Sequence, residues 1–388
     1  MRRYAFLSLV LALFVAAASA QPVPRVTFDN PVAGLCLDIP EDWEMGTSDF
    51  GWLSVGMEAG LGASQCAFFP DFWFFYTANP PELQAKNIAK AWAIAGSTPQ
   101  IVPAGNGNFE VRFTSNDGRG QLVNRWCCRR QGNVSYVLAA MVRPEHAAQF
   151  QADIDAALAS AHLVARQAAT LFREPSERAY RMLIPQGWQW DGQILRTTQA
   201  PGVFVWKVQT PDQLNGAFNA PPTSFNIAVP FTPAAQCAKT FVLQGLRKQV
   251  PDLQLDGIRE LPRVGAYFVA MIKAAGLGKN PRVDKCRAEY VGTRNGTPLR
   301  IHCDVGTMML DASALLGGRG DWTMTACGYW APQQGFAVAS KIGRGVVCSI
   351  STDPVWKANQ REVVRQERWY QELLRDSVAN GWDEYLGQ

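Results

Sequence analysis

The sequence predicts an α+β fold in which two successive units each place an antiparallel sheet between helices. Two observations predict it. A short pattern of a strand, a proline, a tight turn and a tryptophan occurs twice. Short β-rich runs separated by turn residues are also interrupted by a few stretches with helical periodicity. The composition, 47% hydrophobic and 18% charged, is that of a globular protein and excludes a mostly disordered chain.

The repeated pattern divides the chain. Residues 37–43 read Leu-Asp-Ile-Pro-Glu-Asp-Trp, and residues 182–188 read Met-Leu-Ile-Pro-Gln-Gly-Trp. The proline ends each strand because it cannot donate to the ladder, and the next two residues carry the turn. Each unit is also predicted to close with a strand followed by a proline and a helix. We therefore expect a duplication, with a first domain at 21–165 and a larger second domain with insertions at 166–388.

The elements of the first unit follow from local patterns. The aromatic run at 71–77 predicts a central strand buried on both faces. Asn79 and two prolines begin a helix that Gly96 ends. Strands are predicted at 109–114 and 121–129, joined by a turn at 116–118, and a last strand at 135–142. The closing helix at 145–161 has one apolar face: Phe150, Ile154, Ala157, Leu158 and Ala161.

In the second unit, a helix is predicted at 234–249. The β-rich runs at 266–272, 285–292, 298–305, 321–330 and 346–352 predict strands. Asp353 and Pro354 then read as the beginning of a long helix. Its predicted buried residues are Val363, Tyr370, Leu374 and Val378.

The first twenty residues predict export. Arg2 and Arg3 precede an apolar stretch, and Ala18-Ser19-Ala20 supplies a cleavage site after Ala20. We expect a secreted or periplasmic protein without a membrane span, because no later segment is apolar over about 20 residues. A formal net charge of +4 is too small to indicate nucleic-acid binding.

The Ile-Pro-x-x-Trp opening at 39–43, the mid-chain helix, the antiparallel strands and the strand-proline-helix ending resemble the PsbP-like superfamily. The resemblance covers nearly all of the first unit and the two ends of the second. It implies a central antiparallel sheet between helices and a non-enzymatic module that binds or stabilises partners. No site residue of that family transfers to this sequence.

Nine cysteines and an oxidising compartment predict disulfides. Cys286 and Cys303 flank the Asn295-Gly296 turn. A four-residue loop would place them opposite each other, and a two-residue turn would place them diagonally on one face. Cys127 and Cys128 should point to opposite faces of a strand, so only one of them can meet Cys36 or Cys66 in the core. The alternative is that several cysteines are small buried hydrophobic residues.

No catalytic motif and no cofactor or metal site is predicted. The sequence has no Gly-x-Ser-x-Gly, no Cys-x-x-Cys and no His-x(3–5)-His. Three candidate ligand-binding residues remain, the tryptophans at or just after the repeated turns: Trp43, Trp188 and Trp190. The sequence thus favours an exported, non-catalytic binding or accessory module for an unknown protein or small molecule, with a contact surface between the units or on an exposed sheet face. The alternative is a secreted hydrolase whose acid and base are scattered through the second domain.

Overall fold

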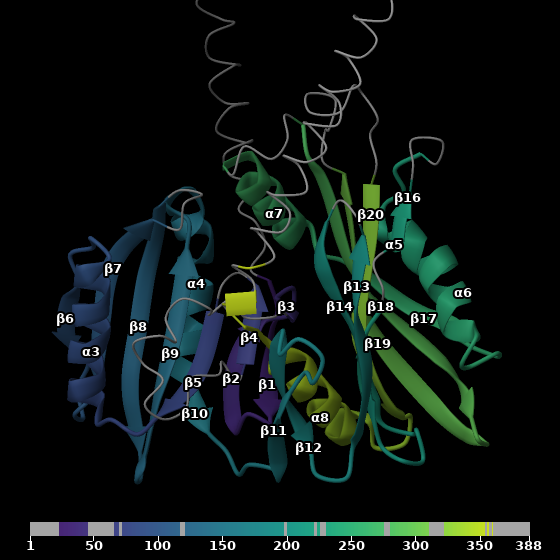
Figure 1. Ribbon diagram of the computed structural model, residues 1–388, viewed down its shortest axis with the longest axis horizontal. Helices are drawn as coiled ribbons and strands as arrows, with labels where there is room; N and C mark the ends of the chain where they lie inside the picture. The colour runs from purple at the N-terminus through teal and green to yellow at the C-terminus, as the bar shows by residue number, and fades with distance from the viewer. Residues whose placement is uncertain are drawn as a thin grey trace, which may run out of the picture.

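The computed structural model describes residues 23–45, 66–69, 72–116, 121–197, 200–220, 223–225, 230–274, 280–309, 322–353, 355–356 and 359. They form a mixed α+β fold of antiparallel sheets and helices (Figure 1), as the α+β part of the prediction expects. Among the described residues, none of the helices has the length and hydropathy of a transmembrane segment.

The first half contains one small and one large sheet. The small sheet has the order β1-β2-β10, from Arg25–Asn30, Leu35–Pro40 and His162–Leu163. The large sheet has the order β3-β4-β5-β9-β8-β7-β6. Its strands in chain order are Glu44–Met45, Cys66–Phe69, Phe72–Thr77, Gln100–Pro103, Phe109–Asn116, Gln121–Gln131 and Val134–Val142. Helix α3 (Pro81–Ile94) follows β5, and α4 (Pro144–Ser160) follows β9.

The second half has the same two kinds of sheet. Its small sheet has the order β11-β12-β21, from Ala169–Arg173, Tyr180–Pro185 and Ser351–Thr352. Its large sheet has the order β13-β14-β15-β20-β19-β18-β17, with β16 also paired to β20. These strands, β13 to β20, are Gln189–Thr197, Ala200–Gln209, Gly216–Asn219, Thr223–Phe225, Gln254–Glu260, Arg282–Arg294, Thr297–Met309 and Trp322–Pro332.

Five helical elements are described between the strands of the second half. A continuous helical segment consists of α5 (Ala234–Cys237), a π-helical turn η2 (Ala238–Val242) and α6 (Leu243–Arg247). Helix α7 (Pro262–Ala274) lies between β17 and β18, and α8 (Phe336–Cys348) follows β20. Only α7 has no counterpart among the described helices of the first half, where the short 104–108 connection joins β6 to β7.

The two large sheets have the same strand order. When β13, β14, β15, β20, β19, β18 and β17 are set against β3, β4, β5, β9, β8, β7 and β6, every neighbour relation is preserved. The last short strand of each half returns to the second strand of its small sheet: His162 pairs with Cys36, and Tyr180 pairs with Thr352. The repeat in the sequence therefore has a counterpart in the topology of both sheets of each half.

The repeated turn is also alike in its hydrogen bonds. The main-chain nitrogen of Trp43 donates to the carbonyl of Pro40 at 3.1 Å, and Trp188 donates to Pro185 at 3.1 Å. The main-chain nitrogen after each proline donates to the carbonyl of the residue just before the neighbouring strand, Pro24 at 2.8 Å in the first half and Ala168 at 2.9 Å in the second. The same turn thus ends the second strand of each small sheet.

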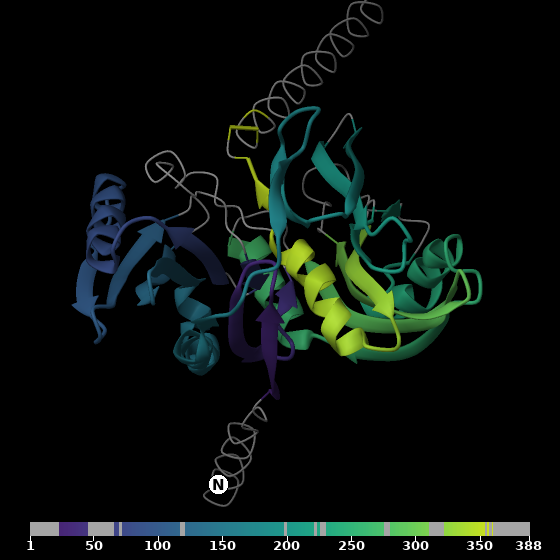
Figure 2. The same ribbon diagram turned by 90° about the horizontal axis from the view of Figure 1, so that it is seen from below.

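Three clusters of buried residues hold these layers together. One lies between α3 and its large sheet, and another lies between α5–η2 and the second large sheet. The third contains residues of both small sheets, of α4 and of α8, and it is continuous across the two halves. Figures 1 and 2 show the result: the large sheets stand at the two sides, and the small sheets with α8 fill the space between them. The predicted two-sided burial of the aromatic strand is confirmed, because Phe74 belongs to the central cluster and Trp73 and Phe75 belong to the outer one.

Two predicted strands are wrong. Residues 266–272 belong to helix α7, whose buried residues Val264, Tyr267 and Ile272 lie on one helical face. A short apolar run does not distinguish a buried strand from a buried helix. Residues 346–348 end helix α8, and only Ser351–Thr352 form a strand there. The stripe predicted for the helix after Pro354 lies outside the described residues.

Candidate functional site

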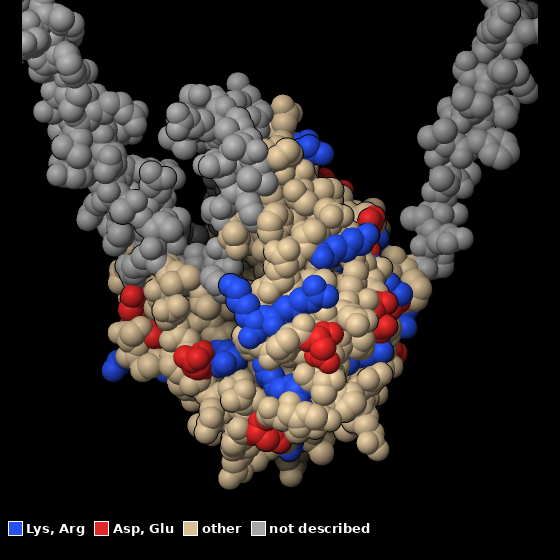
Figure 3. Space-filling view, turned by 90° about the vertical axis from the view of Figure 1, so that its right-hand side faces the viewer, with Lys and Arg blue, Asp and Glu red and all other residues tan. Residues whose placement is uncertain are grey.

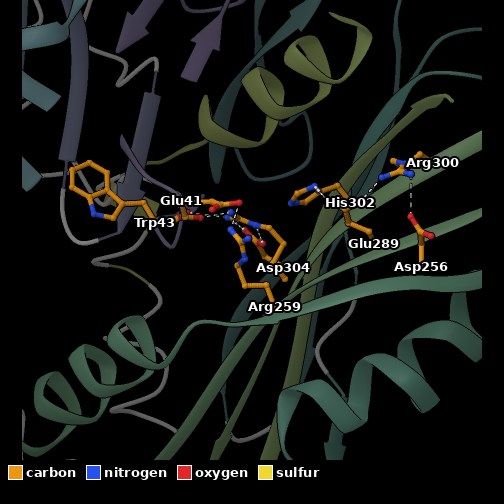
Figure 4. Close-up of polar contacts among 9 residues, drawn as sticks. Glu41, Trp43, Asp256, Arg259, Glu289, Arg300, His302 and Asp304 are labelled. Carbon is orange, nitrogen blue, oxygen red and sulfur yellow. Dashed lines mark hydrogen bonds and ion pairs between the residues drawn. The ribbon is translucent and has the colours of Figure 1, made fainter. Parts of the chain in front are cut away.

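One polar cluster lies where the two halves meet (Figure 4). The guanidinium of Arg287, on β18, donates to the main-chain carbonyls of Glu41 at 2.7 Å and Trp43 at 2.9 Å. It also pairs with the carboxylate of Asp304, on β19, at 2.8 and 3.2 Å. Asp304 is 3% exposed. The side chain of Arg259, on β17, pairs with that of Glu41. The repeated turn of the first half is therefore held by side chains of two strands of the second, and Asp304 on a third strand holds one of these side chains.

A second group continues along the same sheet. Arg300 pairs with Glu289 at 2.6 Å and with Asp256 at 3.0 Å. The Nδ1 atom of His302 lies 3.8 Å from Glu289, and the imidazole stacks on the ring of Tyr329 with centroids 5.0 Å apart. Burial, together with the positive charge of Arg287, lowers the pKa of His302 to about 3. His302 is consequently neutral at physiological pH.

This junction is not arranged as an acid–base site. Asp304, Glu289 and Glu41 are each paired with an arginine, which stabilises the charged carboxylate and opposes its use as an acid. His302 is an uncharged, stacked side chain, and its neighbour Cys303 belongs to the buried cluster below α5. The contacts of Arg287 and Arg259 with the first-half turn join the two halves. The contact surface that the sequence predicts between the units is largely occupied by the shared core and these ion pairs.

A groove of about 790 Å³ lies in the second half. One wall is formed by β13, β14 and β15, and the opposite wall by η2 and α6. Strands β19 and β20 contribute the floor, through Ile301, Met324, Ala326 and Trp330. A groove of this size is within the range of about 300–1,000 Å³ that ligand sites occupy.

The helical wall has an unusual local structure. Residues Ala238–Val242 form a π-helical turn between α5 and α6, and the hydroxyl of Thr240 donates to the carbonyl of Gln236 at 2.9 Å. Such turns occur mostly as single insertions in α-helices, frequently at functional sites. Phe241 and Val242 of this turn line the groove, and Phe241 is 36% exposed.

The polar lining is cationic and rich in amides. Lys207 on β14, Lys248 just after α6 and Arg294 at the end of β18 line the groove, while Asp191 is the one carboxylate among its described lining residues. Arg294 is held in place, because it donates to the Gln213 carbonyl and to the Gln249 side chain, both at 3.1 Å. Burial lowers the pKa of Arg294, although an arginine remains charged under all ordinary conditions. Figure 3 shows the side of the molecule that carries α5 and α6, with Lys and Arg gathered across its middle.

The predicted tryptophans do not form one surface. Trp43 is 1% exposed and belongs to the central core. Trp188 and Trp190 are half-buried and pack against that core, and the Nε1 of Trp190 donates to the hydroxyl of Tyr180 at 3.2 Å. None of the three lines the groove, although Asp191 and Gly192, directly after Trp190, do.

The cysteines differ from the predicted disulfide framework. Within the described part of the chain, Cys36, Cys127, Cys128, Cys237, Cys286, Cys303, Cys327 and Cys348 are all free thiols. The turn at Asn295-Gly296 has two residues with positive φ, so Cys286 pairs with Val305 and Cys303 with Ala288. The two thiols are therefore diagonal on one buried face, which was the alternative that a two-residue turn predicts.

The other cysteine candidates have different outcomes. The prediction that Cys127 and Cys128 point to opposite faces is confirmed, since each belongs to a different core cluster. The side chain of Cys66 lies outside the described residues. Burial raises the pKa of Cys127 to about 11 and that of Cys286 to about 12, which suits small buried side chains rather than nucleophiles. Within the described residues, no three His, Cys, Asp or Glu side chains are grouped as a metal site requires.

The sequence reasoning missed the residues of the groove. Lys207, Phe241, Lys248 and Arg294 come from four separate elements, and none of them belongs to a motif. The only local signal was the predicted helix at 234–249, whose exposed face carries Phe241.

The comparisons with known proteins give little more. The sequence matches no protein-family model and no curated protein. It is similar to the apo structure of the immunity protein TplEi of T6SS from Pseudomonas aeruginosa, with 10% identity over 85% of this chain and 97% of that one, at a TM-score of 0.22. The same protein complexed with "L" peptide gives 11% identity, 85% and 98% coverage and a TM-score of 0.22. A chain of the Tle4–Tli4 complex gives 11% identity, 85% and 98% coverage and a TM-score of 0.23. At these TM-scores the likeness carries no argument about the fold or the function of this chain.

Proposed function

We propose that the protein is an exported, non-catalytic binding module whose ligand site is the groove between β13–β15 and η2–α6. The observation that carries the proposal is the groove itself, with about 790 Å³ of open volume, an apolar floor and a rim of charged and amide side chains. Concave, mostly apolar sites with a few placed polar groups are typical of ligand binding.

The lining of the groove supports binding rather than catalysis. Its described residues include no His, Cys, Ser or Tyr, the side chains that most often serve as nucleophiles or general bases near neutral pH. Asp191 is the only carboxylate among the described residues of the lining, and these residues do not form the two-carboxylate arrangement of glycoside hydrolysis. No observation favours the hydrolase alternative.

The export part of the proposal rests on the leader alone. Cleavage after Ala20 would give a mature protein that begins at Gln21. Amino-terminal sequencing of the protein from its natural source tests this. A chain that retains Met1 and stays in the cytosol would contradict it.

The binding site is tested by photo-crosslinking. Phe241, in the groove, is replaced by benzoylphenylalanine, and Ile94, which is 80% exposed on α3, receives the same group in a control protein. Both proteins are irradiated with an extract of the native extracytoplasmic compartment and analysed by mass spectrometry. We expect a discrete adduct at position 241 and none at position 94. No adduct at 241, or the same adducts at both positions, would contradict the proposed site.

A further inference from the structure

The helix after β5 and the helical segment after β16 pack differently on their sheets. In the first half, α3 lies on β7 and β8, as α5 lies on β18 and β19 in the second. Below α3 the space is filled by Trp73, Trp92 and Trp126, each no more than 6% exposed, with Trp92 and Trp126 in edge contact. Tryptophan side chains thus fill the space under α3, whereas η2 and α6 border an open groove.

The walls of the groove match two different parts of a ligand. Phe218, Phe241 and Trp330 present aromatic surface, which is available to apolar side chains. Gln193, Asn219 and Gln244 place amide groups around it, and amides can both donate to and accept from peptide groups.

The charges have one predominant sign. Lys207, Lys248 and Arg294 face a single carboxylate, Asp191, among the described lining residues. Neither lysine makes an ion pair with any carboxylate of the described chain. Arg259, Arg287 and Arg300, elsewhere in this half, are by contrast paired with carboxylates. Among its described lining residues the groove thus has two more cations than carboxylates, even with Asp191 opposite Lys207 on the neighbouring strand, so negative charge on a ligand is favourable there.

The edge of the sheet favours a polypeptide as the source of that charge. Strand β13 pairs with β14 on one side and is the last strand of the described sheet on the other. Its residues Asp191, Gly192 and Gln193 line the groove. The main-chain groups of an edge strand can pair with an added strand, and the neighbouring pockets then select its side chains.

Together these contacts specify a ligand class, and this step rests on the proposed function. We propose that the groove binds a peptide segment of a protein partner that carries carboxylates beside apolar side chains, with Lys207, Lys248 and Arg294 facing the carboxylates. The apolar side chains lie against Phe218, Phe241 and Trp330. Lys207 and Lys248 set the charge preference, and Arg294, fixed by Gln213 and Gln249, sets the position of one carboxylate.

Two synthetic peptides test the ligand class. Fluorescein-labelled peptides of eight alternating Glu and Leu residues, or eight alternating Lys and Leu residues, are titrated with the mature protein, and fluorescence anisotropy is measured. We expect saturable binding of the acidic peptide only, weakening as salt is raised from about 0.05 to 0.5 M because the contacts are exposed. Equal binding of both peptides, or binding of neither, would overturn the inference.

Charge-reversal variants test the residues. The double variant Lys207→Glu, Lys248→Glu should weaken binding of the acidic peptide at least about fivefold. Lys90, exposed on α3 in the first half, provides the control Lys90→Glu, which should bind like the wild type. Circular dichroism at rising temperature shows whether each variant is folded. An equal loss in the control, or no loss in a folded double variant, would overturn the inference.

The two proposals fail separately. The crosslinker at position 241 is also placed in the lysine double variant. If both proteins capture the same adduct in equal amount, the groove remains a binding site, and the proposal of an acidic ligand is overturned. The absence of any adduct at 241 would remove the proposed function itself.

Discussion

Arg287 donates a hydrogen bond of 2.9 Å to the main-chain carbonyl of Trp43, so a side chain of the second half ends on the repeated turn of the first. The same guanidinium is the partner of Asp304, which is 3% exposed. An arginine that satisfies a buried carboxylate and two carbonyls at once is difficult to replace.

The first prediction concerns this arginine. Arg287→Ala should lower the free energy of unfolding by about 3–5 kcal/mol, because it leaves the buried Asp304 charge without its partner. Urea denaturation monitored by circular dichroism measures the change. The double variant Arg287→Ala, Asp304→Ala removes the charge as well and should recover part of the loss. A loss of less than about 1 kcal/mol in the single variant would contradict the assigned role.

The elements of the fold were predicted better than their contacts. The patterns placed the strand and helix at 134–160 within one residue, because β-rich composition and one-sided helical periodicity are local properties. Residues 266–272 were assigned to a strand because a seven-residue apolar run has no period of its own. The groove could not be predicted, since Lys207 and Lys248 are brought together by packing and not by spacing.

The end of α8 shows a further reason for error. Gly343 and Gly345 weaken the helical pattern because glycine is a poor helix former. In the structure both are required: a Cβ atom at Gly343 would lie 2.8 Å from that of Tyr329, and one at Gly345 would collide with the side-chain oxygen of Asn30. The weak helical pattern at the end of α8 is therefore outweighed by two close contacts, one with Tyr329 on β20 and one with Asn30 in the first half.

The second prediction follows from Gly345. Gly345→Ala should cost about 2 kcal/mol or more, because the methyl group displaces Asn30, whose oxygen accepts from the nitrogens of Val32 at 3.1 Å and Ala33 at 3.0 Å. Gly245→Ala is the matched control: a Cβ there meets no atom within 4 Å, so it should stabilise α6 by about 0.5–1 kcal/mol. Thermal and urea unfolding of both variants decide the matter. Changes of the same sign would show that packing at Gly345 is not the cause.

The third prediction is a dependence on pH at Asp42, which is 8% exposed beside Arg263 and Asp153. Burial raises the pKa of Asp42 above its ordinary value of 3.8, although Arg263 opposes the shift. The folded state therefore binds the proton more tightly, and stability falls as pH rises from 3.8 through the raised pKa. Asp42→Asn should be more stable than the wild type at pH 7, and the difference should vanish below about pH 4.

Glu110 supplies the opposite case for the same measurement. Burial raises its pKa, but hydrogen bonds from Arg125 and Arg112 outweigh burial and hold the pKa below the ordinary 4.5. Its contribution to stability is present above pH 4.5 and is lost as pH falls through the lowered pKa. Glu110→Gln should therefore destabilise the protein at pH 7. The urea midpoints of both variants are measured against the wild type from pH 3 to pH 7. If both variants change the midpoint in the same direction at pH 7, these assignments are contradicted.

The fourth prediction concerns His302. Because burial lowers its pKa from 6.5 to about 3, the unfolded chain binds more protons than the folded protein between these values. Stability should fall as pH decreases through this window. His302→Phe keeps a ring on Tyr329 and has no proton to bind, so its stability should depend less steeply on pH between 6 and 4. An unchanged slope would show that another group is responsible.

The last prediction connects the thiols to the export signal. Of the eight described cysteines, seven are buried and only Cys327 is half-buried, so at most about one of them should react quickly with Ellman's reagent in the folded protein. After unfolding in guanidinium without reductant, we expect all nine thiols of the chain to react.

A count of seven thiols in the unfolded protein would reveal one disulfide, and the variant Cys286→Ser, Cys303→Ser then identifies the pair. If that variant also gave seven, the diagonal pair would be the one oxidised, because removing a bridge removes no free thiol. A count of nine in protein taken from an oxidising compartment would mean that burial alone protects these side chains, since a thiol that stays inside the core cannot approach a second sulfur or an oxidant.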